Sequence, residues 1–195
     1  MNTELLTDES RLERLVVRLA SRGITVTFLD EGNEERVTIA QLRDFRIIIN
    51  RDSRDTAGSL FTIAHLFGHL VQFTDYEAYR HLTERVEEPK PLRLDEEFKR
   101  AFYAYECEAF GYGKTVMREA FPLTPDVERR FAIFMETDFE HFWNYLTTGR
   151  QGDVASFNAL LTRNYHSWAR PIPEIPCLPL PARLELSHPI CVTVS

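Results

Sequence analysis

The chain has 195 residues, with 23 lysines and arginines against 30 aspartates and glutamates and a formal net charge of −7. Its 44% hydrophobic residues can fill a core, which excludes a chain that is disordered throughout. The acidic balance excludes non-specific binding to nucleic acid, because phosphate neutralisation needs clustered lysine and arginine. No stretch offers the roughly 20 apolar residues that cross a bilayer, and residues 1–10 lack the features of a secretory signal. We therefore expect no membrane association and a cytoplasmic location.

The first quarter of the chain predicts a helix followed by a small sheet. Apolar residues recur at helical spacing over residues 9–22, between the capping candidate Asp8 and Gly23. Apolar and β-branched residues then predict strands over residues 24–29, 36–39 and 45–50. We expect a short, curled sheet of three or slightly more strands.

The middle of the chain predicts two long helices. Residues 55–73 are apolar over more than half of a helical circumference, which is typical of a helix central to its fold. Residues 74–94 contain two prolines and predict a connecting loop with one short helical piece. Asp95 is the expected N-cap of the next helix, which runs to about residue 121.

The last third of the chain predicts two more helices and a tail. Thr124 and Pro125 form a cap and first-turn pair for a helix that ends before Gly149, and a last helix spans about residues 153–165. Residues 171–195 hold six of the ten prolines, so they predict an extended tail. The tail is apolar enough to pack along the domain or onto a partner.

The sharpest chemical signal is the pair His65 and His69, four residues apart on the most apolar helix. This spacing puts both imidazoles on one helical face, where two ring nitrogens can bind one metal ion. A catalytic zinc site commonly takes a third ligand from another element. The next long helix offers Glu106 and Glu108, one on either flank of its apolar face, and periodicity leaves both open.

Two segments of the chain resemble the ImmA/IrrE family of zinc metallopeptidases. They are Leu60-Phe61-Thr62-Ile63-Ala64-His65-Leu66-Phe67-Gly68-His69-Leu70 and Glu106-Cys107-Glu108-Ala109-Phe110-Gly111-Tyr112-Gly113. The resemblance implies an α+β, zincin-like domain over residues 1–120, with a helical extension over 121–170 and the proline-rich tail over 171–195. It also implies zinc as the cofactor and Glu106 as the third ligand, with Glu108 as the fallback.

Two residues depart from the family pattern. The family's general base, a glutamate directly after the first histidine, is Leu66 here, and the family's asparagine or aspartate is Phe110. A leucine cannot take a proton from a metal-bound water, and general acid–base catalysis is typically worth about 10² to 10⁴-fold. We therefore expect an intact metal site in a protein with little or no peptidase activity.

Three hypotheses follow from these residues. The first is a pseudo-peptidase that holds zinc through His65, His69 and Glu106 and regulates another protein by binding it. Because family members cleave DNA-binding repressors, the resemblance implies a repressor-like partner. The second is an active zinc endopeptidase whose base comes from elsewhere, with Glu108, Asp75 and Glu77 as candidates. The third is a metal-free interaction module.

Two further patterns in the sequence give weaker indications of a binding site. Gly113-Lys114-Thr115 imitates the end of a phosphate-binding loop, but it lies within a predicted helix rather than after a strand. Cys177, His188 and Cys191 could form a second metal site, although structural zinc sites normally show tighter paired spacing. We expect the three cysteines to be reduced thiols.

Overall fold

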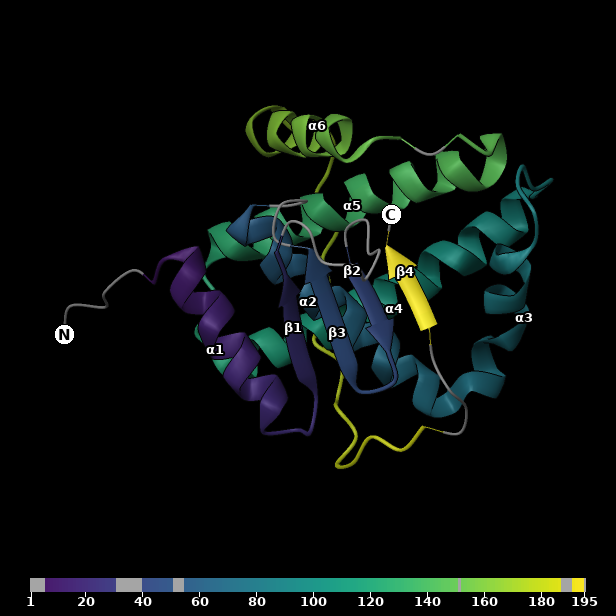
Figure 1. Cartoon of the computed structure of the whole chain (residues 1–195). Helices are drawn as coiled ribbons and strands as arrows, with labels where there is room; N and C mark the ends of the chain where they lie inside the picture. The colour runs from purple at the N-terminus through teal and green to yellow at the C-terminus, as the bar shows by residue number, and fades with distance from the viewer. Residues whose placement is uncertain (1–5, 31–39, 51–54, 151, 187–190, 195) are drawn as a thin grey trace.

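The computed structural model describes residues 6–30, 40–50, 55–150, 152–186 and 191–194, and it is a mixed α+β structure. The helices and strands, in chain order, are α1 (Asp8–Ala20), β1 (Thr25–Leu29), β2 (Ala40–Arg43), β3 (Arg46–Asn50), α2 (Thr56–Gln72), the 3-10 turn η2 (Phe73–Asp75), α3 (Tyr76–Glu87), α4 (Glu96–Ala120), α5 (Pro125–Thr148), α6 (Val154–Ser167) and β4 (Cys191–Val194). Figure 1 shows the sheet lying across α2, with α1 beside β1 and with α5 and α6 at the top of the view.

The sheet has four strands in the order β1-β3-β2-β4. β1 and β3 run parallel, whereas β2 is antiparallel to both β3 and β4. Asp44 takes a φ of 49° in the tight turn between β2 and β3, a left-handed conformation that aspartate tolerates. The predicted strand over residues 36–39 lies outside the described residues. The tail contributes an edge strand, β4, where the sequence predicted only extended chain.

The N-caps predicted at Asp95 and Thr124 are confirmed, the one predicted at Asp8 is wrong, and Asp55 is a further N-cap that was not predicted. Asp55 accepts a hydrogen bond from Gly58 N (2.7 Å), Asp95 accepts one from Phe98 N (2.7 Å), and Thr124 caps α5 ahead of Pro125. Gly149 ends α5 with a φ of 68°. The N-cap of α1 is Thr7 rather than Asp8.

The segment over residues 74–94, predicted as a loop with one short helical piece, contains a longer helix than expected. A helix of 12 residues, α3, spans Tyr76–Glu87. Leu82 of α3 is buried in a cluster with Phe102 of α4 and Leu146 of α5, so tertiary packing stabilises a helix of this length. Only the part after Glu88, which contains both prolines, is irregular.

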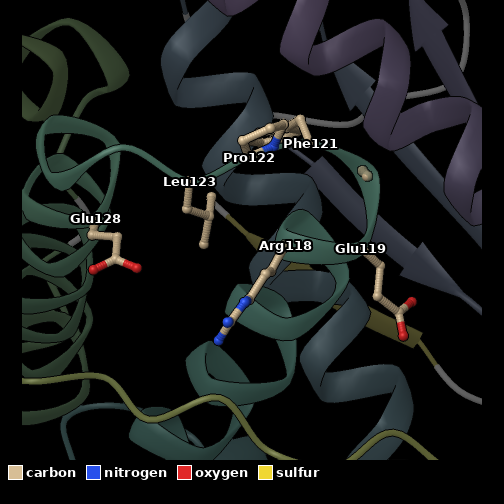
Figure 2. A pocket seen from close by; sticks show the side chains of 7 residues that line it. Arg118, Glu119, Phe121, Pro122, Leu123 and Glu128 are labelled. Carbon is tan, nitrogen blue, oxygen red and sulfur yellow. The ribbon is translucent and has the colours of Figure 1, made fainter.

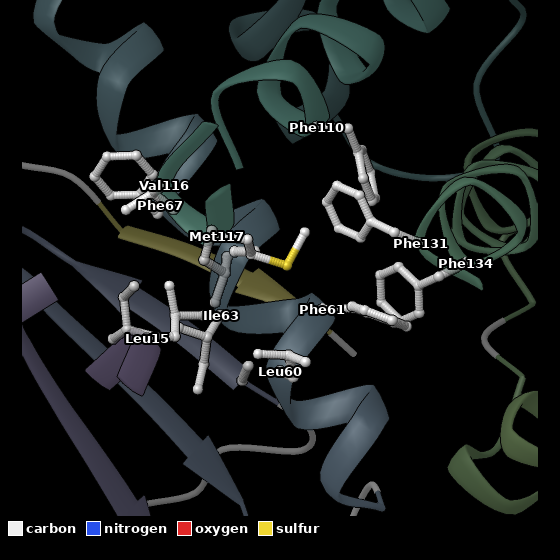
Figure 3. Close-up of a cluster of buried hydrophobic side chains, with 14 of the residues drawn as sticks. Leu15, Leu60, Phe61, Ile63, Phe67, Phe110, Val116, Met117, Phe131 and Phe134 are labelled. Atoms are coloured by element: carbon white, nitrogen blue, oxygen red, sulfur yellow. The ribbon is translucent and has the colours of Figure 1, made fainter. Parts of the chain in front are cut away.

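α2 is the centre of the fold, as its composition predicted. All of its residues from Ala57 to Gln72 are buried. Aromatic rings from α4 and α5 pack on it: the centroid of Phe61 lies 5.3 Å from that of Phe131 and 5.8 Å from that of Phe134 (Figure 3). The helix that carries both histidines is therefore fixed on all sides by the core.

The proline-rich tail packs along α4. Lys114 Nζ donates a hydrogen bond to Ile175 O (2.9 Å), and Thr115 Oγ1 donates one to Leu178 O (2.7 Å). Ile175 is 5% exposed. The lysine and threonine that imitate a phosphate-binding loop are thus engaged with tail carbonyl groups in the middle of α4.

Candidate metal centre

The two histidines of α2 lie side by side in the interior. Their ring centroids are 4.5 Å apart, and both side chains are buried. The i, i+4 spacing accounts for this placement, because such residues lie one above the other on a helix. The sequence prediction that both rings share one face is confirmed.

A close approach between α2 and α4 brings the third side chain to these rings. A Cβ atom built on Gly68 of α2 would lie 1.9 Å from Ala109 O of α4, and one built on Gly113 of α4 would lie 2.6 Å from Ala64 O of α2. Only glycine allows two helical backbones to come this near. The distance between the helices is therefore set by one glycine on each.

Glu106 is the acid that meets both histidines. Its Oε2 lies 2.9 Å from His65 Nε2 and 3.5 Å from His69 Nε2. One possible ligand atom from each of the three side chains lies within 4.8 Å of the others. Among the described residues, no other group of three or more such side chains meets in this way.

The three side chains fit the requirements of a zinc ion. Zinc–ligand bonds of about 2.0–2.2 Å in tetrahedral geometry place neighbouring ligand atoms about 3.4 Å apart. The 3.5 Å between Glu106 Oε2 and His69 Nε2 matches this value, whereas the 2.9 Å to His65 Nε2 would lengthen around a bound ion. Two imidazole nitrogens and one carboxylate oxygen are also the ligand set of many catalytic zinc sites. The sequence left Glu106 and Glu108 open, and the structure places Glu106 against both rings.

The carboxylate of Glu106 and the neighbouring histidines favour each other's charged forms. Burial alone would raise the pKa of Glu106, but the neighbouring histidines outweigh it and lower the pKa to about 2. Burial alone would lower the pKa of His69, but the Glu106 carboxylate outweighs it and raises the pKa above its ordinary value. The centre thus holds a buried anion that needs a positive charge beside it, either a protonated histidine or a metal cation.

The two departures from the family pattern lie at this centre. Leu66 is fully buried and joins the hydrophobic core. The Phe110 ring stacks on His65 with the centroids 4.1 Å apart and an interplanar angle of 25°. Neither residue supplies a group that can accept a proton.

The three carboxylates considered as substitute bases differ in their surroundings. Glu108 accepts hydrogen bonds from Tyr79 Oη (2.5 Å), Gln72 Nε2 (3.1 Å) and Tyr112 Oη (3.3 Å). Asp75 lies in η2, and Glu77 lies in the first turn of α3, 3.6 Å from Arg80. Glu108 is therefore committed to a hydrogen-bond network.

Sequence reasoning missed two residues that contact the histidines. Gln72 Oε1 lies 2.9 Å from His69 Nδ1, and Asp138 Oδ2 of α5 lies 3.6 Å from His65 Nδ1. The position of Gln72, three residues after His69 on the same helix, was a local signal for its contact. Nothing local pointed to Asp138, which comes from a helix predicted only as part of the C-terminal extension.

The weaker second metal site lacks support from the described residues. Cys177 is an exposed free thiol, with Arg118 Nη1 4.0 Å from its sulfur. His188 lies outside the described residues, and Cys191 lies in β4.

A surface hollow of about 600 Å³ lies at the C-terminal end of α4 (Figure 2). Arg118, Leu123 and Glu128 are among its lining residues. Arg118 follows Glu106 by three turns of α4, about 18 Å along the helix axis. This hollow is therefore separate from the metal centre.

Comparison of the chain with models of known protein families, with characterised proteins and with solved structures finds no match in any of the three. The ImmA/IrrE resemblance therefore stays a prediction. Within the parts of the chain that the structure describes, no helix combines the length and apolarity needed to cross a bilayer.

Proposed function

We propose that the chain is a metal-binding pseudo-peptidase of the ImmA/IrrE type, with a zincin-like fold, that acts by binding another protein. The observation that carries the proposal is the buried meeting of His65, His69 and Glu106 within 4.8 Å. Zinc is the metal that this set of nitrogen and oxygen ligands suits best.

The residue at the family's base position, Leu66, supports a pseudo-peptidase. Zinc bound by three protein ligands would keep one position for a water and would lower the pKa of that water. Leu66 has no group to take up a proton, and Glu108 is held by three hydrogen bonds. Neither residue therefore supplies the proton transfer that peptide hydrolysis needs, and the Asp138 carboxylate faces His65 Nδ1, the ring nitrogen opposite the one that faces Glu106.

The burial of the three ligand side chains also supports a protein without peptidase activity. His65, His69 and Glu106 are 4%, 5% and 8% exposed, respectively. A peptide substrate must bring its carbonyl group to the metal, and the rings of Phe110 and Tyr105 cover the two imidazoles. This packing favours a metal that stabilises the domain over one that meets a peptide.

A protein is the favoured partner on grounds of charge. The net charge of −7 opposes direct binding to DNA or RNA. The ImmA/IrrE resemblance suggests a DNA-binding repressor in the cytoplasm as the partner, so any effect on transcription would be indirect.

The metal content of the purified protein tests the proposal. Untagged wild type, His69→Ala and His81→Ala are purified without added metal and analysed by mass spectrometry. His81 is exposed on α3, so its variant controls for the loss of a histidine as such. We expect about one zinc per chain in wild type and His81→Ala, and none in His69→Ala. No metal in the folded wild type would refute the proposal.

A second measurement tests the loss of peptidase activity. Zinc-loaded wild type is incubated with unfolded casein, with and without a chelator. We expect no chelator-sensitive cleavage. Cleavage that the chelator abolishes would instead show an active peptidase with a base from elsewhere.

A further inference from the structure

Both imidazoles of the candidate metal centre turn their second ring nitrogen toward an oxygen atom. His69 Nδ1 faces Gln72 Oε1 at 2.9 Å, and His65 Nδ1 faces Asp138 Oδ2 at 3.6 Å. The Nε2 atom of each ring faces Glu106. A histidine that binds a metal through one nitrogen usually donates its other N–H to a nearby oxygen, which fixes the tautomer and the orientation of the ring.

The orientation of the Gln72 amide follows from its partners. Its Nε2 donates to Tyr105 O (2.7 Å) and to Glu108 Oε2 (3.1 Å), so its Oε1 remains to accept a hydrogen bond from His69. Gln72 is 2% exposed, and water does not compete for these bonds. The ring of His69 therefore carries its proton on Nδ1 and directs Nε2 toward Glu106.

Glu108 of α4, which binds Gln72, is itself held by hydroxyl groups from α3 and α4. It accepts hydrogen bonds from Tyr79 Oη (2.5 Å) and Tyr112 Oη (3.3 Å). Burial and the Glu108 carboxylate raise the pKa of Tyr79, so the phenol keeps the proton that it donates. A continuous chain of contacts thus connects α3 to His69 through Glu108 and Gln72.

Asp138 of α5 faces the imidazole of His65. Phe110 of α4 stacks on one face of the His65 ring, and the oxygen that faces Nδ1 at the ring edge comes from a third helix. The distance of 3.6 Å is longer than a hydrogen bond, but it is short enough for the carboxylate to act on the ring electrostatically. A cation on Nε2 would strengthen this attraction, because it makes the Nδ1–H group more positive.

We propose that Gln72 and Asp138 are positioning residues for the metal centre, each holding one histidine so that its Nε2 points at the metal. The inference rests on the proposed metal-binding function. It assigns α5 a role in a site whose ligands all come from α2 and α4. Loss of such a partner typically weakens metal binding about 10 to 100-fold.

Zinc affinity and the cobalt spectrum test this proposal. Wild type, Gln72→Met, Asp138→Asn and Asp138→Ala are compared with Asp126→Asn, which removes an exposed carboxylate from the same helix as Asp138. The zinc dissociation constant is measured by competition with a chromophoric chelator. The visible absorption of the Co²⁺-loaded protein reports the ligand geometry independently of any activity.

We expect zinc to bind about 10 to 100-fold more weakly to Gln72→Met and Asp138→Ala, with a changed cobalt spectrum. Asp138→Asn keeps an oxygen that can accept from His65, so it should lose less than Asp138→Ala, and Asp126→Asn should match wild type. If Asp138→Ala does not fold, Asp138→Leu, which has a branched side chain of similar shape and no acceptor, takes its place and should weaken zinc binding to the same extent.

Two results would overturn the proposal in distinguishable ways. Folded Gln72 and Asp138 variants that bind zinc within about threefold of wild type, with the same cobalt spectrum, would remove the positioning role and leave the metal site intact. A wild type that binds neither Zn²⁺ nor Co²⁺ would remove the proposed metal-binding function, and the positioning role with it.

Discussion

The contact between Gly68 and Ala109 predicts that one methyl group can open the metal centre. Gly68 lies between the two histidines on α2, and the Ala109 carbonyl lies on α4 three residues after Glu106. In Gly68→Ala, the new Cβ would lie 1.9 Å from Ala109 O and 2.5 Å from the carbonyl carbon. Both atoms belong to helical backbone, so no change of rotamer can relieve the clash.

The size of the effect follows from ordinary contact distances. Carbon and oxygen atoms pack at about 3.4 Å, so α2 and α4 must separate locally by about 1.5 Å. Overpacking of this kind typically costs about 1–3 kcal/mol, and the better helix propensity of alanine offsets about 1 kcal/mol of it. Metal sites tolerate only about 0.2 Å of error in ligand distance, so metal affinity should fall more steeply than stability.

Two assays on the same proteins measure these effects. Urea unfolding of the metal-free protein gives the free energy of unfolding, and chelator competition gives the zinc dissociation constant. The control is Gly152→Ala, whose Cβ would meet the His141 side chain at 2.5 Å. That ring can move, so we expect the control to behave like wild type.

An unchanged Gly68→Ala variant would show that this glycine does not set the distance between α2 and α4. If Gly68→Ala unfolds at the same urea concentration as wild type and binds zinc within about threefold, the two helices are not held at backbone contact. The glycine would then have no part in bringing Glu106 to the histidines.

Three further predictions concern Leu66, the pair of Asp8 with Arg130, and Lys114. Leu66 is 0% exposed in the core, so Leu66→Glu buries a carboxylate without a partner and should lower the free energy of unfolding, measured in urea, by about 3–5 kcal/mol, whereas Leu66→Met should cost less than about 1.5 kcal/mol. The Arg130 guanidinium lowers the pKa of Asp8 in the folded protein. This pair therefore stabilises the fold fully above the ordinary carboxyl pKa of about 4. The stabilisation is lost as the pH falls through the lowered pKa of Asp8 in the folded state. Acid should therefore destabilise wild type more than Asp8→Asn. Lys114→Met removes a hydrogen bond to the tail and should speed tryptic cleavage after Arg183.

Each of these predictions has its own contrary outcome. A Leu66→Glu variant as stable as Leu66→Met would show that position 66 does not lie in the core. Parallel acid-unfolding curves for wild type and Asp8→Asn would show that the contact of Asp8 with Arg130 carries no net stability. Unchanged trypsin kinetics in Lys114→Met would show that the remaining contacts hold the tail by themselves.

Local chemistry made several features predictable from the sequence. The predicted caps Asp95 and Thr124 act on backbone groups within three residues, so their roles do not depend on the rest of the fold. The shared face of His65 and His69 follows from helical geometry alone. The central position of α2 follows from its composition, because a helix that is apolar nearly all round must be buried.

The tertiary structure decided everything that depends on how one helix lies against another. Glu106 and Glu108 flank the same apolar face, and the rotation of α4 on α2 determines which of them reaches the histidines. That rotation is fixed by the backbone contacts of Gly68 and Gly113, which periodicity does not reveal. Asp138 reaches His65 across 73 positions of sequence, and no local pattern encodes such a contact. The spacing of residues within one helix is written in the sequence, whereas the meeting of three helices depends on the packing of their side chains.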